Sequence, residues 1–265
     1  NDYLTQNNGL LILDGATGTN LMKAGMPSGV CPEQWILEHP QVLIDLQSEY
    51  VNAGSHIIYA PTFTANRIKL KEYGLEDKQE EFILELVNLS KKASNNKALI
   101  AGDITMTGKQ LRPVGDLELE ELIDVYKEQI NYLVKAGVDL LVVETMMSLA
   151  ETRAALIAAK EVCELPVMVS FTFEESGRTL FGTDPATAAI VMESLGASAI
   201  GVNCSSGPAQ MVEIIKQMKD VCSIPLIAKP NAGLPIMDSE GNMTYPMKAE
   251  EFAKEEDLIF LCGHY

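Results

Sequence analysis

Eight short apolar runs, each followed by a longer segment with helical periodicity, constrain the fold of this 265-residue chain more than any other feature. The runs are almost continuously hydrophobic, which is typical of parallel strands buried on both faces. Eight such strands alternating with helices predict an α/β fold, a (β/α)₈ TIM barrel, and barrels of roughly 250 residues are ordinary single domains. The runs are Leu10–Leu13, Ile57–Ala60, Ala98–Gly102, Leu140–Val143, Val167–Phe171, Ala199–Val202, Leu226–Ala228 and Leu258–Leu261.

The segments between the runs have the spacing of amphipathic helices. In the clearest case the apolar residues recur at helical spacing and are predicted to share the buried face. A glycine at position 54, 137 or 196 then precedes the next strand, where we expect a left-handed helix C-terminus. The apolar residues of that helix are Leu119, Leu122, Ile123, Tyr126, Ile130, Leu133 and Val134.

The last βα unit departs from this pattern. Only eleven residues separate Pro246 from Leu258, about half the length of the earlier helical segments. We therefore expect one domain over residues 1–265 whose barrel is clipped or divergent at its last βα unit.

Asp184 and Pro185 are predicted to be the N-cap and first residue of an earlier helix.

Composition and charge exclude several classes of function. The formal net charge of −17 disfavours binding to nucleic acid and to anionic membranes, because phosphate groups would be repelled. No apolar stretch approaches the ~18 residues of a membrane span. The segment Asn1 to Asn8 has no basic residue, so we expect that it is not a signal peptide. Five widely spread cysteines without an export signal predict reduced thiols in the cytoplasm.

The loop after the first run has the composition of a binding site for an amino acid. Asp14 is followed by Gly15, Ala16 and Gly18, and such a loop exposes amide N–H groups. The amides suit a ligand carboxylate, and Asp14 suits a ligand ammonium. An ordinary tight turn capped by Asp14 and Thr17 is the alternative.

Three further strand ends carry polar residues that a barrel places at its functional face. Glu144 ends the fourth run and needs a partner. That partner is a ligand ammonium or a neighbouring arginine or lysine, unless Glu144 caps the next helix. Cys204 follows Asn203 and precedes a polar loop, where a thiol is available as a metal ligand. Lys229 is the one good position for the Schiff-base lysine of an aldolase, an alternative that we rank low.

These residues belong to a longer series of motifs that resembles the zinc-dependent homocysteine S-methyltransferases, from about Leu10 to about Lys248. Within that family the chain is most similar to homocysteine-binding domains that work with cobalamin. The motifs occur in the family's order. They are Asp14-Gly-Ala-Thr-Gly-Thr19, Thr62-Phe-Thr-Ala-Asn66, Gly102-Asp-Ile-Thr-Met-Thr-Gly108, Glu144-Thr145, Gly177-Arg-Thr179 with Gly182-Thr-Asp184, Gly201-Val-Asn-Cys204 and Pro230-Asn-Ala-Gly-Leu-Pro235.

The resemblance implies a (β/α)₈ barrel that transfers a methyl group to the thiol of homocysteine, giving methionine. It implies that Asp14 and Glu144 receive the substrate's amino group, with Gly15, Ala16 and Asn203 in the same substrate site. Cys204 corresponds to one of three cysteine ligands of Zn²⁺, and no catalytic residue is implied beyond this metal activation. The implied methyl donor is methylcobalamin on a separate domain or protein, recharged by a domain or protein that binds methyltetrahydrofolate.

The family's adjacent Cys-Cys pair, which supplies the other two zinc ligands, occurs nowhere in this sequence. Cys262, and less directly His264, stand near its expected place. The alternative to a methyltransferase is therefore a non-catalytic or metal-deficient barrel that binds an amino acid.

Overall fold

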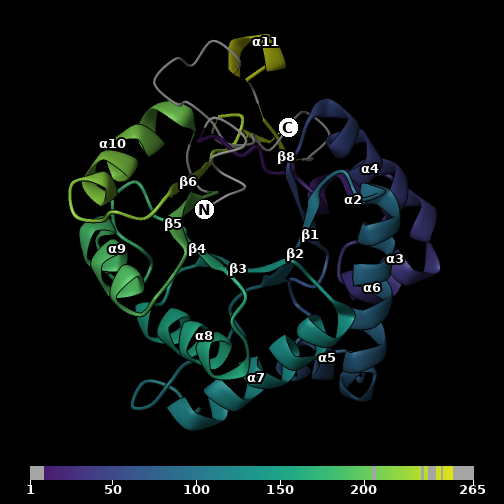
Figure 1. Ribbon diagram of the computed structural model, residues 1–265, viewed down its shortest axis with the longest axis horizontal. Coiled ribbons are helices and arrows are strands. Elements are labelled where there is room, and N and C mark those ends of the chain that lie inside the picture. The colour runs from purple at the N-terminus through teal and green to yellow at the C-terminus, as the bar shows by residue number, and fades with distance from the viewer. Residues whose placement is uncertain (1–8, 205–206, 234–235, 238–242, 246, 253–265) are drawn as a thin grey trace.

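Parallel strands curl around a central axis inside a ring of helices (Figure 1) in the computed structural model, which describes residues 9–204, 207–233, 236–237, 243–245 and 247–252. Six strands pair in chain order, β1-β2-β3-β4-β5-β6, and every pair is parallel. The strands are β1 Ile57–Ala60, β2 Leu99–Ile104, β3 Leu140–Met146, β4 Val167–Phe171, β5 Ala199–Asn203 and β6 Leu226–Lys229.

The first predicted strand, Leu10–Leu13, extends this sheet by a single parallel bridge between Leu13 and Ile57. His56 anchors the bridge, because its Nδ1 accepts a hydrogen bond of 2.9 Å from the Ile12 amide. The predicted strand Leu258–Leu261 lies outside the described residues, so seven of the eight runs are found at the sheet. The TIM-barrel fold is confirmed, and it is clipped within the described part of the chain.

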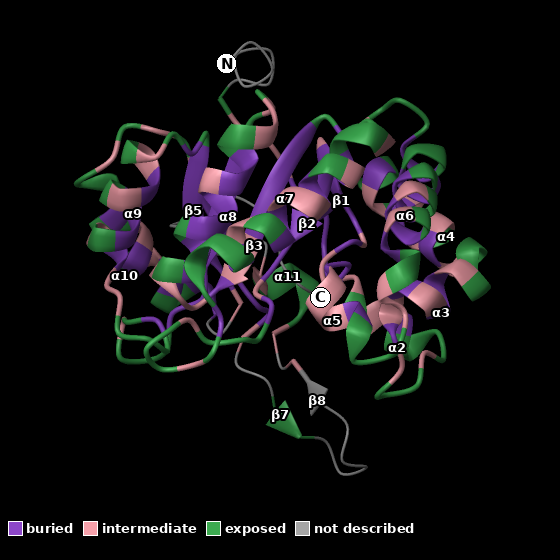
Figure 2. Cartoon of the chain, turned by 90° about the horizontal axis from the view of Figure 1, so that it is seen from below, coloured by how far each residue is buried: buried purple, intermediate pink, exposed green. Residues whose placement is uncertain are grey.

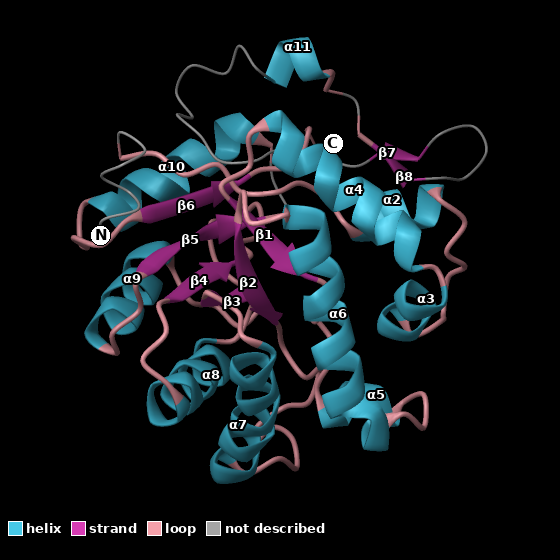
Figure 3. Ribbon diagram, turned by 45° about the vertical axis from the view of Figure 1, so that its right-hand side comes forward, coloured by secondary structure: helices cyan, strands magenta, loops and turns pink. Residues whose placement is uncertain are grey.

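Helices cover the outside of the sheet, as Figure 3 shows. The long helices α4, α6, α7, α8, α9 and α10 follow one another around the strands. The helical segments are α2 Gly18–Lys23, α3 Pro32–Glu38, α4 Pro40–Ala53, α5 Arg67–Lys71, the 3₁₀ turn η1 Glu76–Lys78, α6 Gln79–Ser94, α7 Leu119–Ala136, α8 Leu149–Val162, α9 Pro185–Ser194, α10 Pro208–Lys219 and α11 Ala249–Phe252.

Local sequence signals explain where these helices begin and end. Gly54, Gly137 and Gly196 all have positive φ, as expected of left-handed helix ends. The Asp184 side chain accepts from the Thr187 amide and Pro185 opens α9, as predicted. The predicted buried face of α7 is right at its centre and wrong at its ends. Leu119 and Val134 are 40% and 38% exposed, since they lie in the first and last turns.

The core of the described residues has three parts: one on each side of the sheet and a third among the helices α2 to α6, around Trp35 and Leu43. The largest part lies between strands and helices, and most residues of the six-stranded sheet are buried (Figure 2). A smaller apolar cluster fills the inside of the barrel and includes Leu13, Ile57, Ala101, Val142 and Ile227. A short antiparallel pair, β7 Ile236–Met237 with β8 Met243–Thr244, follows β6 and was not predicted.

Candidate functional site at the C-terminal ends of the strands

Polar side chains form a layer on the inside of the barrel, directly beyond its apolar filling. Side chains alternate between the two faces of a strand, so the residue two positions after an inward-facing one also faces inward. Ala101, Val142 and Ile227 belong to the interior apolar cluster. The residues two positions further on are Asp103, Glu144 and Lys229, and all three are ionisable. The same rule puts Ser170 of β4 and Asn203 of β5 in this layer.

Asp14 is held at this layer by the backbone of β1. Its Oδ2 accepts a hydrogen bond of 2.8 Å from the Tyr59 amide, and the residue is 1% exposed. Burial raises the pKa of Asp14 to about 7, although the Lys229 ammonium and the Tyr59 amide both lower it. The carboxylate therefore does not cap the following turn, which removes the capping alternative for Asp14 and leaves it facing the barrel interior.

Lys229 lies between the two predicted ammonium-binding acids. Its Nζ is 3.4 Å from Glu144 Oε2 and 3.9 Å from Asp14 Oδ1. The same Nζ lies 3.9 Å from the centroid of the Tyr59 ring, a cation–π contact. The structure thus brings Asp14 and Glu144 together around one cation. The alternative of a neighbouring lysine as the partner of Glu144 is realised in this chain.

The loop after Asp14 is fixed by Tyr50 of α4. The Tyr50 hydroxyl donates to the Ala16 carbonyl at 2.9 Å, and the Asn20 amide donates to the same carbonyl at 2.7 Å. Gly15 lies so close to the Tyr50 ring that an added Cβ would be 2.8 Å from its Cε1 atom. This packing orients the peptide groups of Gly15 and Ala16 at the barrel mouth. Contact of their amides with a ligand stays a prediction.

Asn203 joins the ends of three strands. Its Oδ1 accepts from the Thr145 amide at 3.0 Å and from Ser170 Oγ at 2.9 Å. Its Nδ2 donates to Thr145 Oγ1 at 2.8 Å and to Cys204 Sγ at 3.3 Å. The side chain is fully buried. Asn203 therefore orients Thr145 and Cys204, and its predicted contact with substrate is untested.

Cys204 stands beside these groups with the backbone in the left-handed region, at φ 61°. Its amide donates to the Lys229 carbonyl at 3.2 Å. Burial, and then the Glu144 carboxylate, raise the pKa of the Cys204 thiol to about 11. The thiol is therefore protonated at neutral pH without a metal ion.

A zinc ion needs more ligands than the described chain supplies. Catalytic zinc is held by three protein ligands, with a fourth position left open. Among the described residues, no group of three His, Cys, Asp or Glu side chains is placed to hold a metal. Cys262 and His264 lie outside the described residues. The part of the chain that the structure describes thus offers one thiol, Cys204, and does not complete a zinc site.

The sequence interpretation missed two members of the buried charged layer. Asp103 is 6% exposed, and its Oδ1 is buried without a hydrogen-bond partner. Burial, and then the Glu144 carboxylate, raise the pKa of Asp103 well above its usual range. Lys229 was weighed only as a Schiff-base lysine. The signal in the sequence was the alternation of side chains along a strand, because both residues come two positions after an inward-facing residue and so face inward as well.

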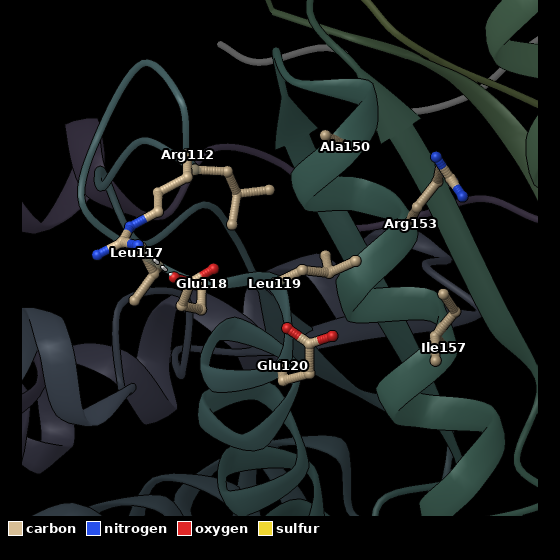
Figure 4. A pocket seen from close by; sticks show the side chains of 9 residues that line it. Arg112, Leu117, Glu118, Leu119, Glu120, Ala150, Arg153 and Ile157 are labelled. Atoms are coloured by element: carbon tan, nitrogen blue, oxygen red, sulfur yellow. Dashed lines mark ion pairs between the residues drawn. The ribbon is translucent and has the colours of Figure 1, made fainter.

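Two surface cavities lie away from this layer. One, of about 220 Å³, is lined by the loop after β2, the start of α7 and α8 (Figure 4). Its lining is partly apolar and includes the charged residues Arg112, Glu118, Glu120 and Arg153. Arg112 is paired with Glu118 at 2.8 Å. The other cavity, of about 300 Å³, adjoins it and shares Leu111, Arg112 and Ala150. None of the predicted site residues lines either cavity, so we place the site at the polar layer.

Two findings bear on the surroundings of the protein. The cysteines among the described residues, Cys31, Cys163, Cys204 and Cys222, are free thiols. In the part of the chain that the structure describes, no helix is long and apolar enough to cross a membrane.

Known proteins resemble this chain in sequence. Methionine synthase of Mycobacterium leprae is 28% identical over 262 residues, which cover 92% of this chain and 22% of that protein. Methionine synthase of Mycobacterium tuberculosis is 28% identical over 270 residues, covering 96% of this chain and 22% of that protein. The chain thus spans about a fifth of the length of these relatives.

Solved structures show the same fold. The homocysteine methyltransferase MmuM of Escherichia coli, in its metallated form, superposes with a TM-score of 0.78 at 20% identity, over 99% of this chain and 93% of that one. The family model of homocysteine S-methyltransferases matches residues 11–260, nearly the whole chain. The chain therefore belongs to the homocysteine S-methyltransferase family.

Proposed function

We propose that this chain binds homocysteine at the polar layer and presents its thiol for methylation, which yields methionine. The observation that carries the proposal is the excess of acidic over basic side chains in the buried layer at the barrel mouth. Asp14, Asp103 and Glu144 are acidic, and the Lys229 ammonium lies within 4 Å of Asp14 and of Glu144. A ligand ammonium would offset the excess, since buried charges need partners.

Different residues of the layer bind the ammonium and the carboxylate of homocysteine. Asp14 and Glu144 receive the α-ammonium, and the amides of Gly15 and Ala16 receive the α-carboxylate. The side chain of homocysteine then extends toward Cys204 at the neighbouring strand end. The substrate thiol must lose its proton, because the thiolate is the nucleophile. Its sulfur forms the new bond to the methyl carbon as the bond from that carbon to the donor breaks.

We include Zn²⁺ and methylcobalamin in this proposal because the family resemblance implies both. When bound, zinc would supply deprotonation of the substrate thiol, with Cys204 as one ligand. Methylcobalamin would be held by a separate cobalamin-binding domain or protein, next to one that binds methyltetrahydrofolate. The much greater length of the methionine synthases supports further domains in those relatives. The free thiols support a reducing compartment, for which we propose the cytoplasm.

The second candidate is a barrel that binds an amino acid without methyl transfer. The observation in its favour is that no group of three His, Cys, Asp or Glu side chains among the described residues could hold a metal ion. The aldolase alternative is disfavoured, because Lys229 is ion-paired with Glu144 and an ammonium has no lone pair to attack a carbonyl.

Two measurements on the same sample test the proposal. Calorimetry compares L-homocysteine with 4-sulfanylbutanoate, which has the same thiol and carboxylate but no ammonium. We expect tighter binding of homocysteine. A methyl-transfer assay with added zinc and free methylcobalamin then measures methionine. Equal affinity for both ligands would contradict the ammonium site, whereas binding without methionine formation would favour the second candidate.

A further inference from the structure

The polar layer raises a conflict between two cations. Asp14 and Glu144 are the proposed partners of the ligand ammonium, yet the Lys229 ammonium already lies within 4 Å of both. Two ammonium groups between the same pair of carboxylates repel each other, and the repulsion is strong because the layer is buried. A bound ligand therefore requires a different partner for Lys229.

The contacts of Lys229 are suited to exchange. The distance to Glu144 is 3.4 Å and that to Asp14 is 3.9 Å, both longer than the 2.7–2.9 Å of a strong charge-assisted hydrogen bond. The contact with the Tyr59 ring does not fix the direction of the ammonium N–H bonds, since the ammonium is attracted by the whole ring face. Lysine also carries its charge on a flexible four-carbon stem, which lets the ammonium change partner without a movement of β6.

Asp103 supplies the missing partner. It lies in the same inward-facing layer, from β2, and its charge interacts with those of Glu144, Lys229 and Asp14. Its Oδ1 is fully buried with no hydrogen-bond partner. A buried carboxylate oxygen left without a donor is costly and calls for an explanation. An arriving ammonium would remove that cost.

Given the proposed function, on which this assignment rests, we propose that the ligand ammonium displaces Lys229 from Asp14 and Glu144 and that Asp103 then becomes the partner of Lys229. With the ligand bound, three acidic side chains surround two ammonium groups. Pairing with Lys229 favours the ionised form of Asp103, so its carboxyl proton is released to solvent. Asp103 is thus a positioning residue: it acts on the ligand through Lys229. The device selects ligands with a free α-ammonium, because only these displace the lysine.

A double-mutant cycle on the whole chain tests this coupling. The affinity for L-homocysteine is measured by calorimetry in the wild type, Asp103→Asn, Lys229→Met and the double variant. We expect Asp103→Asn to weaken binding about tenfold, because Lys229 then stays on the ligand's acids. Lys229→Met removes the competing cation and is expected not to weaken binding. In the Lys229→Met background, Asp103→Asn is expected to change the affinity less than about twofold.

Asp139→Asn is the matched control, because Asp139 precedes β3 at the opposite end and its exposed carboxylate accepts from the Ile100 amide. It is expected to leave the affinity unchanged. An equal loss from Asp103→Asn in both backgrounds, or none in either, would overturn the proposal. So would a loss of affinity in Lys229→Met, because Lys229 would then hold the ligand itself.

The remaining outcomes are also decisive. If Lys229→Met does not fold, Asp103→Asn alone is compared on L-homocysteine and 4-sulfanylbutanoate. A loss confined to homocysteine supports the exchange, and equal losses overturn it. If the four affinities are as expected but the wild type transfers no methyl group, the proposed function is contradicted and the exchange of Lys229 between acids is still supported. Wild-type protein that does not distinguish the two ligands would overturn the exchange.

Discussion

Asn203 holds Thr145 on two sides, accepting from its amide at 3.0 Å and donating to its Oγ1 at 2.8 Å. Thr145 has φ 59°, a left-handed backbone that a β-branched residue rarely adopts. Such a conformation persists where the surroundings fix it. The side chain of Asn203 thus compensates for backbone strain directly after Glu144, and so helps to place that carboxylate.

Replacement of Asn203 by alanine is expected to lower the free energy of unfolding by about 2–4 kcal/mol, because the Thr145 amide and the Ser170 hydroxyl would lose their shared acceptor. Urea denaturation measures the effect. Ser170→Ala is the matched control and removes only one of these bonds, so a cost of about 1 kcal/mol is expected. Equal stability of Asn203→Ala and Ser170→Ala would show that Thr145 does not depend on Asn203.

Asp14→Asn is expected to weaken homocysteine binding by ~1.5–3 kcal/mol, the scale of a charge-assisted hydrogen bond. The asparagine can keep an acceptor for the Tyr59 amide, but it removes the charge and replaces the other carboxylate oxygen by an NH₂ donor. Calorimetry gives the affinity, and exposed Asp45 of α4 provides the control Asp45→Asn. An unchanged affinity in Asp14→Asn would remove Asp14 from the ammonium site.

The strands could be predicted from the sequence because both of their faces are buried. Seven of the eight apolar runs lie at the sheet, and β1 and β4 have the predicted bounds. The same feature hides which residues face inward, since an apolar run carries no alternation to reveal its orientation. Only the polar residues at the strand ends carry that information.

The charged layer was predicted in part for this reason. Asp14, Glu144 and Cys204 were recognised by their positions at strand ends and by the motifs around them. The pairing of Lys229 with Glu144 joins residues 85 positions apart. It depends on barrel closure, which local patterns do not encode. Asp103 stood within a recognised motif, but its missing partner is visible only in three dimensions.

Stability is expected to fall as the pH rises from about 4 to about 7, in part through Asp14. The pKa of Asp14 is about 7 in the folded state against 3.8 for an unperturbed aspartate, so the folded state binds the proton more tightly. The resulting stabilisation is complete below the unfolded pKa and is lost as the pH rises through the folded one. Denaturation curves between pH 4 and pH 8 measure it. Asp14→Asn should show a smaller decline, and parallel curves for the two proteins would contradict the shift.

Zinc binding tests whether ligands beyond Cys204 exist in the chain. We expect the 265-residue chain to hold zinc weakly, because the described residues offer one thiolate ligand and the sequence has no Cys-Cys pair. Metal analysis after dialysis against a mild chelator measures it. Stoichiometric zinc that is lost in Cys204→Ser but kept in the control Cys222→Ser would contradict the prediction and point to Cys262 or His264 as further ligands.

Gly15→Ala is expected to disturb the loop that carries the predicted carboxylate-binding amides. The new Cβ would lie 2.8 Å from the Tyr50 ring, so Tyr50 would move and strain its hydrogen bond to the Ala16 carbonyl. We expect a loss of about 1–3 kcal/mol in stability, the usual cost of overpacking, together with weaker homocysteine binding. Gly18→Ala is the matched control, because a Cβ there meets nothing within 4 Å. Gly15→Ala that behaves like Gly18→Ala in denaturation and calorimetry would show that Tyr50 does not fix the loop.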